Sequence, residues 1–239
     1  MKNKILVLGG SSDIGVTVIK KLLQKNYYVT AHFSSNNRNL NNLKKNYKLL
    51  NLVKINFAKI NNNNINKVIS GKKLYNFSNI INLVGYIDNK SFLNTNLESM
   101  IKALKINVLI PTLIIRSNLN YMMKNNFGRI LNCSTIGIKF GGGEFSYNYN
   151  LSKHCLEFIP NKFKSLSEKN VLINNLRIGF TDTKIHKRMK KTLKGAKRVK
   201  LIPMKRMSKP DEISEYIISL ISEKNSYMTG QTLTVAGGE

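Results

Sequence analysis

The chain has 239 residues, 42% of them hydrophobic, which is enough to bury one sizeable core, and we expect a single domain over residues 1–239. A formal net charge of +27 raises the question of a nucleic-acid partner, because clustered lysines neutralise phosphates. Lysine and asparagine are over-used along the whole chain, however, and no helix-turn-helix, zinc-finger or aromatic RNA-binding signature accompanies them. We therefore expect no nucleic-acid partner.

The amino-terminal apolar stretch is too short for a signal peptide or a membrane span. The two cysteines, Cys133 and Cys155, lie far apart and have no C-x-x-C spacing. We expect a cytoplasmic protein with reduced, buried thiols, no disulfide and no membrane partner. The three histidines, His32, His154 and His186, lack metal-ligand spacing, so we expect structural or surface roles for them and no metal site.

Short apolar runs alternate with helical patterns along the chain. The first run, Ile5-Leu6-Val7-Leu8, enters a glycine-rich turn, and apolar residues then follow at helical spacing over residues 14–23. Further strands are expected at 28–33, 49–55, 80–84, 130–133, 171–178 and 232–235. Continuous apolar strands that alternate with amphipathic helices predict an α/β fold, a doubly wound parallel sheet of the Rossmann type with both faces covered.

The turn after the first strand has the sequence Gly9-Gly10-Ser11-Ser12-Asp13-Ile14-Gly15. Between a strand and a helix, backbone N–H groups and the helix dipole can hold a pyrophosphate. Gly9 and Gly15 would permit the tight turn and close packing, and the hydroxyls of Ser11 and Ser12 could donate to phosphate. We expect cofactor contacts from Gly9, Ser11, Ser12, Asp13, Ile14 and Gly15.

The end of the second expected strand bears on the choice of nicotinamide cofactor. Proteins that prefer NAD place an acid about twenty residues after the glycine loop, where it binds the ribose hydroxyls. No Asp or Glu occurs here between Asp13 and Asp88, and Phe33 takes the approximate place of the acid. Ser34 and Arg38 follow, and a guanidinium binds phosphate strongly. The sequence therefore predicts NADP(H) rather than NAD(H).

Tyr149 and Lys153 lie four residues apart, on one face of a helix that we expect to continue through Leu156, Phe158 and Phe163. A free tyrosine has a pKa near 10, and an adjacent ammonium stabilises the phenolate, so we expect Lys153 to lower the Tyr149 pKa. The strand upstream ends in two hydroxyl residues, whose O–H groups can polarise a carbonyl beside the tyrosine; these are Ser134 and Thr135.

An ordered series of motifs resembles the short-chain dehydrogenase/reductase family over almost the entire chain. The glycine loop is similar to T-G-x-x-x-G-x-G, with Leu8 for the threonine and Asp13 for the middle glycine. The stretch Asn82–Gly85 is similar to N-N-A-G, and Asn107 matches an asparagine of a family helix. Tyr149 and Lys153 match Y-x-x-x-K, and Ile178–Thr183 is similar to P-G-x-x-x-T without its proline. Residues 203–213 and 226–238 are similar to the carboxyl-terminal signature of the family.

The resemblance implies hydride transfer between nicotinamide C4 and a carbonyl carbon, with Tyr149 as general acid. Lys153 would also hold the nicotinamide ribose, and Asn107 would anchor a water in the proton relay. The carbonyl would be held by Thr135, with Ser134 as the alternative, because the family has serine about thirteen residues before the tyrosine. Cofactor contacts are implied for Asn82 and Gly85 on the adenine side, and for Gly179, Thr181 and Thr183 at the carboxamide.

The segment from residue 184 to residue 206, here called the basic segment, contains eleven Lys or Arg residues and no acid. Such a segment suits an anionic substrate, such as a 3-oxoacyl group on an acidic carrier protein or a phosphorylated or nucleotide-linked keto-sugar. The resemblance further implies a homodimer or homotetramer, built through the helices near 98–124 and 149–168 and the last strand. The alternatives are a non-catalytic NADP(H)-sensing regulator and a longer nucleotide-sugar epimerase, for which the chain is too short.

Overall fold

The computed structural model describes residues 4–35, 38–184 and 193–239. Within these ranges, seven strands form one sheet in the order β3-β2-β1-β4-β5-β6-β7, and each neighbouring pair is parallel. The strands are β1 (Lys4–Leu8), β2 (Tyr28–Phe33), β3 (Leu50–Lys54), β4 (Asn79–Asn82), β5 (Gly128–Thr135), β6 (Val171–Ile178) and β7 (Thr232–Val235). The doubly wound α/β fold predicted from the sequence is confirmed.

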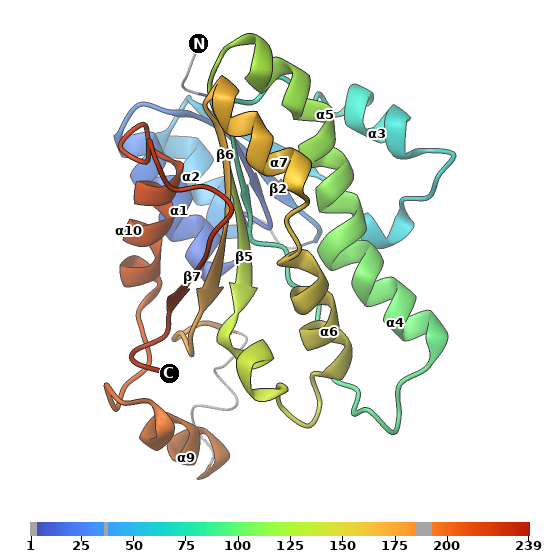
Figure 1. Ribbon diagram of the computed structural model, residues 1–239, viewed down its shortest axis with the longest axis vertical. Coiled ribbons are helices and arrows are strands. Elements are labelled where there is room, and N and C mark those ends of the chain that lie inside the picture. Colours follow the sequence, from blue (N-terminus) through green and yellow to red (C-terminus); the bar gives the residue numbers. More distant parts are fainter. Residues whose placement is uncertain (1–3, 36–37, 185–192) are drawn as a thin grey trace.

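Helices cover both faces of the sheet (Figure 1). One layer holds α1 (Asp13–Gln24), α2 (Arg38–Asn46) and α10 (Pro210–Ile221), and the other holds α3 (Ile65–Gly71), α4 (Leu97–Leu104), α5 (Ile110–Lys124), α6 (Tyr147–Leu156) and α7 (Asn161–Ser165). Shorter turns lie at Phe57–Lys59, Ile136–Phe140 and Leu166–Lys169, a π-helical turn at Lys105–Leu109 joins α4 to α5, and α9 (Leu193–Leu201) lies near the carboxyl ends of the strands. No helix in the described ranges is long and apolar enough to cross a membrane.

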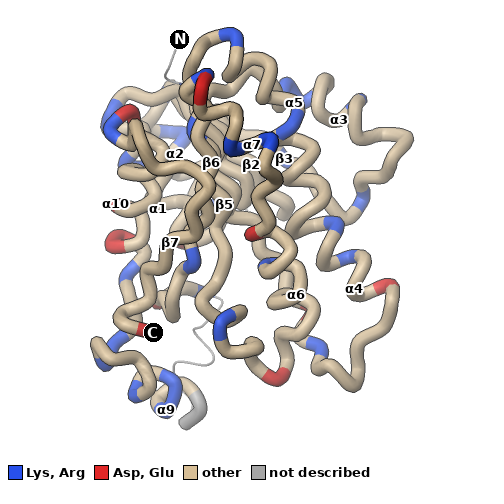
Figure 2. The backbone as a smooth tube through the Cα atoms, viewed as in Figure 1, with Lys and Arg blue, Asp and Glu red and all other residues tan. Residues whose placement is uncertain are grey.

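Basic residues are spread over the helices of both layers (Figure 2). Lys and Arg appear in this view on α2, α4, α5, α6, α7 and α9, and they far outnumber the acids. The positive charge is therefore not confined to one face or one helix.

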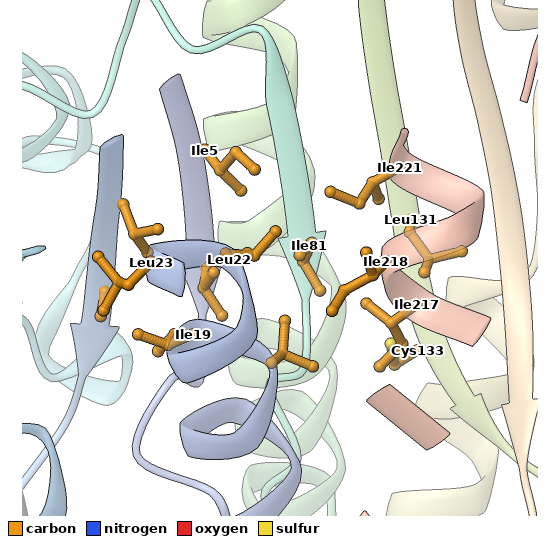
Figure 3. Packing of buried hydrophobic residues seen from close by; sticks show 14 of the residues in the cluster. Ile5, Ile19, Leu22, Leu23, Ile81, Leu131, Cys133, Ile217, Ile218 and Ile221 are labelled. Carbon is orange, nitrogen blue, oxygen red and sulfur yellow. The ribbon is translucent and has the colours of Figure 1, made fainter. Parts of the chain in front are cut away.

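Alternation along the strands builds two cores, one on each face of the sheet. In β1, Ile5 and Val7 belong to the cluster under α1 and α10, whereas Leu6 and Leu8 belong to the cluster under α5. This follows from the period of two in a strand, and it explains why the strands appear in the sequence as unbroken apolar runs. Figure 3 shows the first cluster, in which the apolar face of α1 and that of α10 lie over the sheet.

The helix that carries Tyr149 is shorter than its sequence pattern predicts. It begins at Tyr147 and ends at Leu156, and α7 begins only after Pro160. A proline lacks the backbone N–H that a helix interior needs, and its ring disfavours helical geometry at the preceding residue. The expectation that one helix continues through Phe158 and Phe163 is therefore wrong: Phe158 lies in the break and Phe163 on α7.

The strand order reverses at β1, which lies between β2 and β4. In open parallel sheets the crevice outside the carboxyl ends of the strands at such a reversal is the usual ligand site. The candidate residues predicted from the sequence follow these ends: Gly9–Gly15 after β1, Ser34 after β2, Gly85 after β4, Ser134 and Thr135 at the end of β5, and Gly179–Thr183 after β6.

Candidate active site

A cavity of about 280 Å³ opens at the carboxyl ends of β1, β4, β5 and β6. Most of the predicted site residues line it, although they come from segments far apart in the chain. They are Ser11, Ser12, Asp13, Ile14, Gly85, Ser134, Thr135, Tyr149, Lys153, Gly179, Thr181 and Thr183. Gly9, Gly15, Ser34, Arg38, Asn82 and Asn107 are not among the lining residues, and their places are described below.

Tyr149 and Thr135 line the same cavity, and interaction with the Thr135 hydroxyl acts to lower the Tyr149 pKa. Thr135 is the last residue of β5, and its Oγ1 also accepts the N–H of Gly137 at 3.1 Å. Ser134 lines the same cavity, but its hydroxyl is directed to the carbonyl of Lys153 at 3.5 Å. Of the two residues, Thr135 is the one whose hydroxyl influences the Tyr149 pKa, and both line the cavity in which a carbonyl would be held.

Lys153 is buried, and its Nζ donates to the carbonyl oxygens of Val84 at 2.7 Å and Cys133 at 2.6 Å. Burial disfavours the charged form and lowers the pKa of Lys153 to about 8. The ammonium lies 5.8 Å from the centre of the Tyr149 ring. These carbonyls fix the lysine at the floor of the cavity.

The Tyr149 pKa differs from the sequence-based expectation. Burial of the phenol raises the pKa to about 12, and interaction with the Thr135 hydroxyl offsets only part of that rise. The net direction is therefore opposite to the lowering that the sequence analysis expects from Lys153.

Asn107 is fully buried in the π-helical turn between α4 and α5. Its Oδ1 accepts the N–H of Tyr86 at 2.7 Å, and its Nδ2 donates to the Tyr86 carbonyl at 3.0 Å and to Ser152 Oγ at 2.8 Å. Ser152 in turn donates to the carbonyl of Tyr149 at 2.7 Å. π-Helical turns are frequent at functional sites, and this one connects the segment after β4 to the helix of the tyrosine.

The glycine loop needs its glycines for steric reasons. Gly9 has φ +75°, and a Cβ there would lie 2.8 Å from the backbone of Leu83, while a Cβ on Gly15 would lie 2.7 Å from the carbonyl of Gly10. The Ser12 hydroxyl caps α1: it accepts the N–H of Gly15 at 3.0 Å and donates to the Gly9 carbonyl at 3.0 Å. The sequence predicts that the Ser12 hydroxyl donates to phosphate, but in the structure it donates to the Gly9 carbonyl of the loop.

His32, on β2, supports the glycine loop from the neighbouring strand. It is 3% exposed; its Nδ1 accepts the N–H of Gly9 at 3.2 Å, and its Nε2 lies 2.9 Å from the Ile55 carbonyl. The ring stacks on Phe57 with centroids 4.2 Å apart. Burial lowers the His32 pKa to about 4, so the imidazole is neutral and can accept from the glycine loop. These contacts give His32 a structural role, which agrees with the role expected for it from the sequence.

The side chains of the other predicted cofactor residues differ in setting. Ser34, after β2, and Arg38, the first residue of α2, are exposed, and the first turn of α2 holds no acid. Asn82 is fully buried in the sheet, where Oδ1 accepts the N–H of Val84 at 3.2 Å and Nδ2 donates to Asn132 at 3.2 Å. Asn82 thus shapes the end of β4, and it does not line the cavity.

Acids from other parts of the chain neutralise part of the basic segment. Lys184 contacts Asp13, Arg198 pairs with Glu239 and Arg206 with Glu212. His186 and four of the predicted cations, Lys187, Arg188, Lys190 and Lys191, lie outside the described residues. The net positive charge of the basic segment is therefore smaller in the folded protein than its own sequence suggests. In the described part of the chain, no group of three or more His, Cys, Asp or Glu side chains could hold a metal ion.

This fold and cavity define a doubly wound α/β protein with a phosphate-loop-like turn and a tyrosine–lysine pair at the strand ends. A family model described as enoyl-(acyl carrier protein) reductase matches residues 16–239. The chain belongs to the short-chain dehydrogenase/reductase family.

Curated relatives include 3-oxoacyl-[acyl-carrier-protein] reductase of Aquifex aeolicus, 32% identical over 160 residues, and carbonyl reductase family member 4 of Xenopus laevis, 27% identical over 252. The alignment with the Aquifex aeolicus protein covers 66% of this chain and only 64% of that relative. The alignment with the Xenopus laevis protein covers 100% of this chain and 98% of that relative. A solved 3-oxoacyl (acyl-carrier-protein) reductase of Agrobacterium tumefaciens C58 with NADP bound has a TM-score of 0.86 at 19% identity, covering 99% of this chain and 94% of that one. That likeness shows the common fold.

The cavity fits a nicotinamide dinucleotide on its own geometry. The glycine loop borders the cavity through Ser11, Ser12, Asp13 and Ile14, at the start of α1, where a helix end favours a phosphate group. The nitrogen of Lys153 has three N–H groups, two of which bond the carbonyls of Val84 and Cys133 within the described residues, which leaves one for a ribose hydroxyl.

Proposed function

We propose that the protein is an NADPH-dependent oxidoreductase that reduces a carbonyl to an alcohol. The observation that carries the proposal is the meeting of Thr135, Tyr149 and Lys153 in one cavity with the glycine loop. NADPH, when bound, supplies the hydride to the carbonyl carbon. Tyr149 donates its phenolic proton to the oxygen that becomes the alkoxide, and Thr135 hydrogen-bonds the same oxygen.

Lys153 and Asn107 act beside that pair in the proposal. Lys153 Nζ holds the nicotinamide ribose with its remaining N–H group, and Asn107 anchors the water that resupplies the proton through Lys153. Support comes from the chain of bonds from Asn107 through Ser152 to the carbonyl of Tyr149. On the cofactor side, Gly179, Thr181 and Thr183 are proposed to contact the carboxamide, because all three line the cavity.

The substrate class is proposed from the relatives and from charge. A 3-oxoacyl thioester on an acidic carrier is favoured by the name of the Aquifex aeolicus relative, and a keto-sugar is the second candidate. The test is NADPH oxidation against a panel of both kinds of carbonyl compound. Turnover of at least one supports the proposal; tight cofactor binding without turnover of any would favour the non-catalytic regulator instead. A cytoplasmic location is part of the proposal. Both thiols are expected from the sequence to be buried; Cys133 is buried but Cys155 is exposed, so that expectation is wrong for Cys155.

The preference for NADPH yields a prediction about affinity. The described part of the segment from β2 to α2 has no acid to repel a 2′-phosphate, and Arg38 begins α2. A hydrogen bond to a charged group is worth about 1.5–3 kcal/mol, so NADPH should bind about tenfold or more tightly than NADH in a fluorescence titration. Arg38→Met should weaken the binding of NADPH and leave the affinity for NADH unchanged. Equal or tighter binding of NADH to the natural protein contradicts the proposal.

A homodimer is proposed through α4, α5 and the break after α6, and a homotetramer would also use the last strand. A second cavity, of about 510 Å³, lies along these elements, and three of its apolar lining residues are exposed: Ile101, Leu109 and Phe158, the last by 77%. Exposed apolar patches of this kind mark association surfaces. Phe158→Glu should shift the mass measured by light scattering to that of the monomer. The matched control, Tyr28→Glu on β2, should not, and a monomeric natural protein would refute the proposal.

A further inference from the structure

Asp13 brings a negative charge into the glycine loop at the position where the resembling fingerprint has a glycine. It is the first residue of α1 and lines the cavity. Its side chain is only 21% exposed, so its charge is poorly screened by water. A dinucleotide pyrophosphate at this helix end carries the same sign of charge, and like charges at close range repel.

Lys184, which lies 171 residues further along the chain, meets this carboxylate twice. Its backbone N–H donates to Asp13 Oδ2 at 2.6 Å, and its Nζ lies 3.5 Å from Oδ1. Lys184 follows directly on Thr183, and both line the cavity. The carboxylate is thus directed toward the segment after β6, and its charge is balanced there.

We propose that Lys184 is a positioning residue for cofactor binding, which neutralises Asp13 and joins the glycine loop to the segment that carries Thr181 and Thr183. The inference rests on the proposed function, because it concerns the same cofactor. The paired carboxylate no longer opposes a pyrophosphate at the start of α1. The backbone bond at the same time holds the two sides of the cavity together.

The two contacts can be separated by mutation. Lys184→Met removes the ammonium and keeps the backbone N–H, so it tests the charge alone. Asp13→Asn removes the negative charge and keeps an oxygen that can accept the same N–H. Lys20→Met, on the exposed side of α1, is the matched control for the loss of one positive charge.

The experiment is a fluorescence titration of the full chain with NADPH for the natural protein, each single variant and the double variant. Lys184→Met should weaken the binding of NADPH about tenfold. The same change in the Asp13→Asn background should alter the NADPH affinity less than about twofold. Lys20→Met should have no effect. Melting curves of each variant check that the fold is retained.

Two results overturn the inference. An equal loss from Lys184→Met in both backgrounds means that the lysine binds the cofactor phosphates directly, and it leaves the proposed function intact. No NADPH binding by the natural protein overturns both the inference and the proposed function.

Discussion

Replacement of Tyr149 by Phe is expected to lower the rate of carbonyl reduction about a thousandfold, while NADPH affinity changes less than about threefold. The phenol is the proposed proton donor and lines the cavity together with Thr135, and phenylalanine keeps its ring. Measurement of kcat and KM on the best carbonyl of the panel, together with a cofactor titration, checks both parts. Activity within tenfold of the natural protein would reject Tyr149 as the acid.

Changes at the two neighbouring hydroxyls control for this result. Thr135→Ser keeps a hydroxyl next to the tyrosine and should retain most of the activity, whereas Thr135→Ala should lose it. Ser134→Ala should cost little, because that hydroxyl is directed to the carbonyl of Lys153. A larger loss from Ser134→Ala than from Thr135→Ala would reverse the assignment.

Lowering the pH from 7.5 to 5 is expected to reduce the free energy of unfolding by about 2 kcal/mol through His32 alone. Burial lowers its pKa from 6.5 to about 4 in the folded protein. Between these values the unfolded chain binds the proton and the folded chain does not. The stabilisation is therefore complete above pH 6.5 and declines as the pH falls toward 4, by roughly 3 kcal/mol in all.

Urea unfolding at the two pH values measures this effect, with His32→Gln as the control. Glutamine keeps one donor and one acceptor but does not titrate. Its free energy of unfolding should therefore change much less between pH 7.5 and 5. The low pKa of Glu212, about 2, does not disturb this window, because that carboxyl titrates below pH 4.5. The same pH dependence in both proteins would show that His32 is not the group responsible.

The strands and the place of the site could be predicted because their signals are local. Leu6 and Leu8 make an apolar run with Ile5 and Val7, and a strand buried on both faces needs such a run. The glycine loop likewise has local requirements, the positive φ of Gly9 and the close approach of Gly15 to Gly10. The break between α6 and α7 also has a local signal, Pro160. The prediction of one long helix missed it because that prediction used only the spacing of apolar residues.

Other features depend on burial or on distant pairing, and the sequence does not contain them in any short window. The direction of the Tyr149 pKa shift depends on burial of the phenol, which raises the pKa and which no residue spacing reports. Likewise, no spacing rule connects Asp13 with Lys184, or His32 with Ile55, because the fold alone brings these pairs together. Spacing likewise does not give the direction of the Ser134 hydroxyl, which donates to the carbonyl of Lys153.

The cavity takes its walls from residues between Ser11 and Lys184, so it exists only when β1, β4, β5 and β6 are all in place. A ligand that binds there recognises the folded chain and not the unfolded one. By mass action, cofactor at a hundred times its dissociation constant would add about 2.7 kcal/mol to the free energy of unfolding. Variants that bind NADPH differently will thus differ in melting temperature for that reason alone whenever the cofactor is present.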